Sequence, residues 1–153
     1  MKVEYIIDTI GITRKNFLKA LETCDIEKLN RIPQGFSNNL VWNFAHVMSS
    51  MQMLCYERSG FAPRIDQALV DAYKPQTFPE KFVDEARFET IKEAVMSSVD
   101  ILKDDYKAGI FKHYAERQTR FGVLITNIDE AISYISTHET LHFGYAKALM
   151  RVL

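Results

Sequence analysis

The sequence lacks the features that mark several common protein classes. It has only two cysteines, Cys24 and Cys55, which lie far apart and match no zinc or redox motif. No secretory signal precedes them, so we expect reduced, buried thiols in a cytoplasmic protein. No segment is apolar for long enough to cross a bilayer, which argues against a membrane protein.

Neither sign of charge is in excess, because 19 Lys and Arg oppose 20 Asp and Glu. No basic tract is present, so the charge pattern gives no support for a nucleic-acid partner. The chain also has no internal repeat and no low-complexity segment. Its 153 residues suffice for one domain with a sizeable core, and we expect residues 1–153 to form that domain.

Four stretches have apolar residues at helical spacing and are predicted to be long amphipathic helices. They cover about residues 3–24, 38–58, 84–106 and 127–153. Three prolines mark residues 60–81 as a long surface connection, and 121–125 is predicted as a short strand or an extended loop. These lengths favour an all-α protein, a four-helix bundle with a long crossover.

The second predicted helix is unusual because residues 33–55 carry no formal charge apart from His46. Ser37 or Asn38 is the expected N-cap. A helix without a charged face is usually buried all round. The helix therefore lies centrally in the bundle, or a second subunit covers its other face.

The most informative motif is a pair of histidines, His138 and His142, in the last predicted helix. Residues four apart share one helical face, so the two imidazoles can converge on a single metal ion. The motif also matches the His-Glu-x-x-His signature of zinc peptidases, in which Glu139 would be the general base. Glu139 is otherwise a solvated carboxylate or one that supports a ligand.

A third ligand must come from upstream, and His46 is the best candidate because its helix should be largely buried. His46 lies opposite the main apolar stripe, so this role requires that the side carrying Trp42 and Asn43 also faces a helix. The alternative is a core histidine hydrogen-bonded to Asn43, Ser50 or a backbone carbonyl. His113 lies among charged residues and is expected to be exposed.

These features resemble the DinB/YfiT-like superfamily of bacterial proteins. The likeness covers nearly the whole chain. It is carried by the run Trp42 to His46, the Phe121-Gly122 pair, the last two histidines, Gly144 and the tail from Leu149 to Arg151. The resemblance implies an up-up-down-down four-helix bundle in which His46, His138 and His142 bind a divalent metal. It also implies a homodimer, and relatives that are transferases or isomerases using bacillithiol, mycothiol or glutathione.

We therefore expect a metal-dependent enzyme acting on a small molecule, a thiol-dependent transferase or a hydrolase. All-nitrogen ligands suit zinc or nickel, and also copper or iron, so the identity of the metal stays open, with zinc or nickel favoured. Two alternatives are a non-catalytic dimeric bundle that binds metal or a ligand, and a peptidase using Glu139. Asn43, one turn before His46, is expected to orient that ring or a bound water. The expected pocket residues are Trp42, Asn43, Tyr114, Gln118 and Tyr145.

Overall fold

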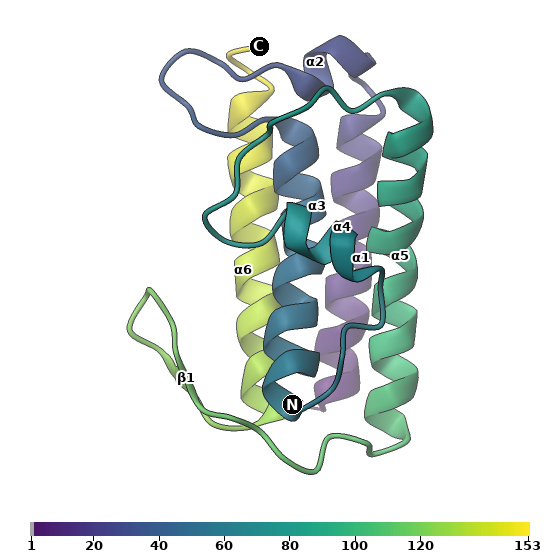
Figure 1. The fold of residues 1–153 in the computed structure, drawn as a ribbon, viewed down its shortest axis with the longest axis vertical. Coiled ribbons are helices and arrows are strands. Elements are labelled where there is room, and N and C mark those ends of the chain that lie inside the picture. Colours follow the sequence, from purple (N-terminus) through teal and green to yellow (C-terminus); the bar gives the residue numbers. More distant parts are fainter. Residues whose placement is uncertain (1) are drawn as a thin grey trace.

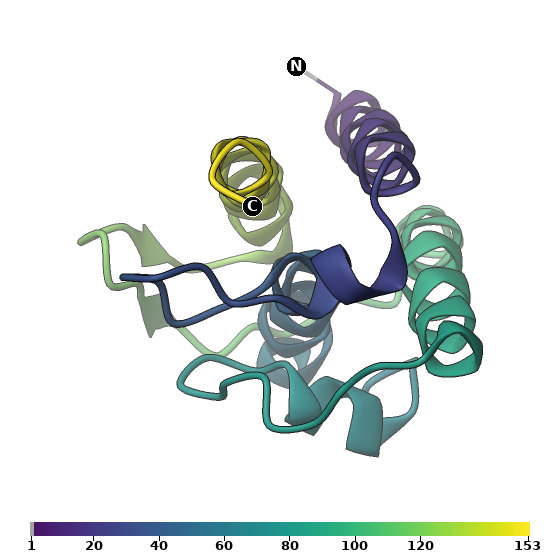
Figure 2. The same cartoon turned by 90° about the horizontal axis from the view of Figure 1, so that it is seen from above.

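The computed structural model describes residues 2–153, and within that range it is mostly helical, as predicted. Four long helices lie side by side along its length (Figures 1 and 2). They are α1 (Val3–Leu21), α3 (Leu40–Met51), α5 (Glu85–Lys107) and α6 (Ile128–Leu149). In the described part of the chain, no helix combines the length and the apolar character needed to span a bilayer.

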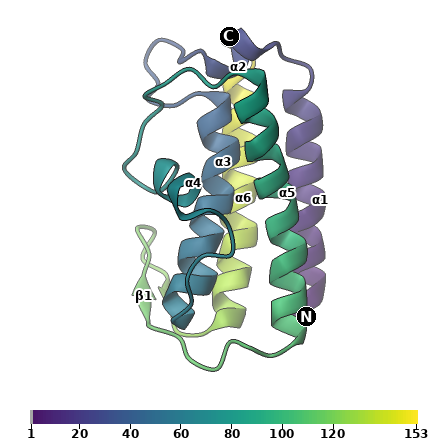
Figure 3. The same cartoon turned by 45° about the vertical axis from the view of Figure 1, so that its right-hand side comes forward.

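The helix directions follow from where the connections lie. The short α2 (Ile26–Asn30) sits at the end of the molecule where α1 finishes and α3 starts, so α3 runs antiparallel to α1 (Figures 1 and 3). The crossover then returns the chain to that same end, and α5 also runs antiparallel to α1. Helix α6 runs parallel to α1, and Phe17 of α1 packs against both Phe44 of α3 and Phe143 of α6. The expected up-up-down-down order is therefore wrong, because the observed order is up, down, down, up.

Three of the long helices begin with a polar side chain that accepts a backbone N–H from the residue three positions on, which stabilises the first turn. The pairs are Asn39 with Trp42, Asp84 with Arg87, and Asn127 with Glu130. The cap of α3 is thus Asn39, one residue beyond the expected Asn38. This placement matters for the site, because it sets where His46 lies along the helix.

Helix α3 continues without a break as a π-helical segment, η1 (Gln52–Tyr56), and a 3-10 turn, η2 (Glu57–Ser59). It stops at Gly60, whose φ of 83° is in the left-handed region that favours glycine. The helical stretch therefore ends close to the predicted position. The chain then enters the crossover.

The crossover was expected to lack regular structure, but it contains a helix, α4 (Gln67–Ala72), which Asp66 caps. Leu69 and Val70 of α4 are buried, and the hydroxyl of Ser49 on α3 donates to the Val70 carbonyl at 2.8 Å. Together with the other long helices, α4 and its flanks bury all twelve residues of α3. The uncharged second face of α3 is covered by the chain itself, so its composition gives no argument for a second subunit.

The irregular region before α6 forms a small hairpin, in agreement with one of the two expected conformations. Its strands are β1 (Arg117–Gln118) and β2 (Leu124–Ile125), which pair antiparallel with Arg117 opposite Ile125. The hairpin projects from the packed helices beside α6 (Figure 1). The side chains of Phe121 and Val123 near its tip are exposed.

Candidate metal site

Three histidines from two helices meet at one point. Because α3 and α6 are antiparallel, His46 lies opposite both His138 and His142. The His46 ring centroid is 5.3 Å from that of His138 and 4.7 Å from that of His142. One ring nitrogen of each residue lies within 4.8 Å of the others. The side of α3 that carries His46 therefore does face a helix, which was the condition for its proposed role.

His46 is held by the crossover. Its Nδ1 is 2.7 Å from the backbone carbonyl oxygen of Tyr73, which can only accept, so Nδ1 carries the proton. Nε2 then has the free lone pair, and the Ser50 hydroxyl lies 3.2 Å from it. The indole of Trp42 stacks on the ring at a centroid distance of 4.4 Å. Burial lowers the pKa of His46 more than the Tyr73 carbonyl raises it, so the ring is neutral.

His142 is held by Asn43. The Asn43 amide donates through Nδ2 to the Asn39 carbonyl at 2.8 Å, which leaves Oδ1 as the acceptor facing the histidine. Nδ1 of His142 donates to that oxygen at 2.9 Å, so Nε2 again has the free lone pair. Asn43 thus orients His142, and its hydrogen bonds do not reach His46, which was one of the two groups it was expected to orient. Burial and the neighbouring His138 and His46 lower the pKa of His142 to about 3.

His138 has a ring nitrogen that the rest of the structure leaves unpaired. Its Nδ1 is buried, and nothing in residues 2–153 offers it a hydrogen bond. A buried polar atom without a partner is rare and needs an explanation. Burial and the nearby His46 lower the pKa of His138 to about 4, so this ring is also neutral. Three neutral imidazoles, one with an unpaired nitrogen, fit a divalent cation as the missing partner.

Comparison with known proteins agrees with this geometry. Residues 10–146 match the DinB superfamily, and this range includes all three histidines. The chain belongs to the DinB superfamily. Among curated proteins, none matches it.

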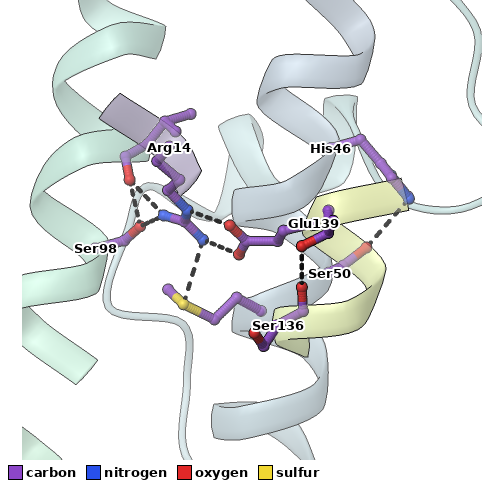
Figure 4. A network of polar contacts seen from close by, with 9 residues as sticks. Arg14, His46, Ser50, Ser98, Ser136 and Glu139 are labelled. Carbon is purple, nitrogen blue, oxygen red and sulfur yellow. Dashed lines mark hydrogen bonds and ion pairs between the residues drawn. The ribbon is translucent and has the colours of Figure 1, made fainter. Parts of the chain in front are cut away.

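One expectation for Glu139 was a solvated carboxylate. In this DinB protein the side chain is instead buried. It is 1% exposed and forms a bidentate ion pair with Arg14 of α1 (Figure 4). The Arg14 Nε–Oε2 distance is 2.9 Å and the Nη2–Oε1 distance is 2.6 Å. Burial raises the pKa of Glu139, and the charge and hydrogen bonds of the Arg14 guanidinium oppose this rise. Both oxygens are engaged, so a general-base role would first require Glu139 to leave Arg14.

The other expected pocket residues have different surroundings in this DinB protein. Trp42 and Asn43 contact the histidines directly, as described above. Tyr145 is 39% exposed on α6 and packs against Phe36. Tyr114 packs in the other part of the core, around η1, where burial raises its pKa. Gln118 is exposed on the hairpin, and the predicted pocket roles of Gln118 and Tyr114 remain predictions.

Several residues that shape the DinB site were missed from the sequence. Tyr73 acts through its backbone carbonyl, which no side-chain pattern reveals. Tyr134 stacks against His138 from one turn earlier, and its i−4 spacing could have indicated this. Arg14 interrupts the buried stripe of α1 between Ile10 and Phe17, and a lone arginine in an apolar stripe was a detectable signal.

Proposed function

We propose that this chain is a four-helix metalloenzyme, a divalent-metal-dependent transferase or hydrolase that acts on a small molecule. Its metal ligands are His46, His138 and His142. The observation that carries the proposal is the convergence of three neutral imidazoles whose ring nitrogens lie within 4.8 Å of one another. Zinc–nitrogen bonds of about 2.0–2.1 Å are within reach of rings placed this closely.

The surrounding residues have the roles that supporting groups play in metal sites. The Tyr73 carbonyl and Asn43 fix the tautomers of His46 and His142, so that both Nε2 lone pairs are available. The Ser50 hydroxyl now near one lone pair can rotate away, since a hydroxyl is free to reorient. Three protein ligands leave at least one coordination position for substrate or water. When bound, a divalent ion lowers the pKa of a coordinated water to about 7 or deprotonates a coordinated thiol.

Among metal-dependent reactions, we favour thiol transfer because of the family resemblance. The co-substrate would be a low-molecular-weight thiol such as bacillithiol, mycothiol or glutathione, and nitrogen donors favour zinc or nickel. The peptidase alternative is less attractive, because both oxygens of Glu139 are held by Arg14. The cytoplasm is the compartment that suits two unpaired cysteines, Cys24 and Cys55.

Metal analysis of purified protein tests the proposal. We expect close to one divalent ion per chain after incubation with zinc or nickel, and loss of that ion in His46→Ala and His142→Ala. His113→Ala is the matched control, because this histidine is exposed and lies outside the cluster. Wild-type protein that stays metal-free with both metals supplied would refute the metal site.

Turnover separates an enzyme from a bundle that only binds metal. The metal-loaded protein is incubated with each of the three thiols and a chromogenic electrophile, and thiol consumption is followed over time. We expect the wild-type protein to consume thiol. His46→Ala should abolish this consumption, and His113→Ala should leave it unchanged. Full metal occupancy without consumption of any thiol would favour the non-catalytic alternative.

We also infer a homodimer, and this inference rests on the family resemblance alone. The composition of α3 no longer supports it, because the crossover and the other helices bury that helix within one chain. Sedimentation equilibrium measures the mass directly. A mass near that of one chain, 17.7 kDa, across the concentration range would contradict the dimer.

A further inference from the structure

Arg14 of α1 contacts residues of the other three long helices (Figure 4). From α1 its guanidinium reaches Glu139 on α6, Ser98 and the Val95 carbonyl on α5, and the sulfur of Met51 on α3. The side chain is 1% exposed, and so is that of Glu139. Such a buried charge needs its partners, because an uncompensated one would be very costly.

The contacts of Arg14 are directional. Nη1 is 2.7 Å from the Ser98 hydroxyl and also donates to the Val95 carbonyl, while Nη2 is 3.4 Å from the Met51 sulfur. The remaining donors form the parallel pair with Glu139 described above. A guanidinium is planar, and a bidentate bond to a carboxylate therefore fixes the direction of the carboxylate as well as its distance.

Glu139 lies between the two α6 histidines in the sequence, so its direction determines theirs. At 3.6 residues per turn, His138 projects about 100° to one side of Glu139, and His142 projects about 60° to that same side. Glu139 points toward Arg14 (Figure 4). The two imidazoles consequently point toward His46 on α3, with ring centroids 5.3 Å and 4.7 Å away. A rotation of α6 about its axis would carry both rings away from His46.

We propose that Arg14 is a positioning residue of the histidine site. Its bidentate pair with Glu139 sets the rotation of α6 and thereby aims His138 and His142 at His46. This role of Arg14 rests on the proposed metal-dependent function only in experiments that measure metal binding. The arrangement of the three rings exists without metal and can be measured separately.

Stability alone does not account for the pair. Buried ion pairs can often be replaced by apolar residues of similar volume with no loss of stability, whereas removal of one partner is strongly destabilising. An apolar pair fills the same space, but it has no directional bond and leaves α6 free to rotate. Positioning and stabilisation therefore predict different outcomes for a double substitution.

The test is the double variant Arg14→Met with Glu139→Leu, compared with wild type in three measurements. Urea denaturation with chelator present reports stability, and competition with a chromogenic chelator reports the zinc Kd. In metal-free protein, nuclear Overhauser contacts report the distances from the His142 ring to His46 and Trp42, whose centroids lie 4.7 Å and 6.4 Å away. We expect a retained urea midpoint, zinc binding weaker by about tenfold or more, and weakened ring contacts. Wild-type affinity and wild-type contacts in this folded variant would overturn the proposal.

Ser98→Ala is the matched control, because it removes a bond to the same guanidinium and leaves the pair with Glu139 intact. We expect it to lower the urea midpoint while zinc affinity and ring contacts stay at wild-type values, and equal losses in this variant would refute a specific role for the pair.

Arg14→Lys decides the question if the double variant does not fold. It keeps the charge but not the planar fork, so the ring contacts should weaken, and wild-type contacts would overturn the proposal. If wild-type protein binds neither zinc nor nickel, the proposed function fails, and the ring contacts alone decide the role of Arg14.

Discussion

Asn43 provides the sharpest test of the site, because one amide connects the protein backbone to one imidazole. It is 1% exposed, accepts from Nδ1 of His142 at 2.9 Å and donates to the Asn39 carbonyl at 2.8 Å. In Asn43→Leu the histidine loses the partner that fixes its tautomer. Loss of such a supporting group typically weakens metal binding 10–100-fold, or about 1.4–2.7 kcal/mol. The two lost hydrogen bonds would also cost about 1–3 kcal/mol of metal-free stability.

Two further variants separate these effects. Ser49→Ala removes one buried hydrogen bond of the same helix, to the Val70 carbonyl, without touching a histidine. It should cost about 1 kcal/mol of stability and leave metal affinity unchanged. Asn43→Asp keeps an acceptor for His142 but cannot donate to Asn39, so it should bind metal better than Asn43→Leu. Zinc affinity by chelator competition and urea denaturation with chelator present measure both quantities. Wild-type affinity in Asn43→Leu would refute the assignment of Asn43 as the group that orients His142.

Three more predictions follow from burial and charge. The pKa of His138 is lowered to about 4 and that of His142 to about 3, so below an unfolded pKa of about 6.5 the unfolded chain binds more protons. Metal-free protein should therefore lose stability as the pH falls from about 6.5, down to about 4 for the His138 contribution and about 3 for that of His142. The loss should be about 2 kcal/mol per ring at pH 5, and His142→Asn should flatten this dependence in urea titrations. Burial raises the pKa of the Cys55 thiol, so a thiol reagent followed by mass spectrometry should modify Cys24 and leave Cys55 unmodified in native protein. Glu139→Gln should lower the urea-measured stability by about 3–5 kcal/mol, because it leaves a buried guanidinium without its counter-charge, and an unchanged stability would contradict a fixed ion pair.

The parts of the fold that were predicted are those encoded by local patterns. Helix α6 was predicted from its apolar repeat and from Asn127, whose side chain caps it. The uncharged stretch around His46 correctly indicated a helix buried on all sides. The third helix was predicted over 84–106 and is observed over Glu85–Lys107. In each case residues close in sequence determine the result.

The features that were not predicted depend on contacts between distant segments. Helix α4 has only six residues and depends on α3 for its burial, so its own pattern is too short to recognise. The contact of His46 with Tyr73 spans 27 residues, and that of Arg14 with Glu139 spans 125. The order of helix directions was also wrong, since it came from the resemblance and not from the position of the connections. Local patterns thus located the histidines but did not reveal what holds them.

The distribution of side chains around α6 shows why the His-Glu-x-x-His match alone does not indicate a peptidase. In a zinc peptidase all three residues of the motif must serve the same metal centre. Here His138 and His142 point toward His46 on α3. Glu139 instead points toward α1, where it pairs with Arg14 (Figure 4). The residues of the motif therefore lie in two environments. The two histidines face the third histidine with neutral nitrogen atoms, whereas Glu139 belongs to a buried ion pair. A motif defined by spacing alone does not show whether its carboxylate faces the histidine site or an arginine. An arginine in the buried stripe of a neighbouring helix does show this, because it is the partner with which the carboxylate pairs.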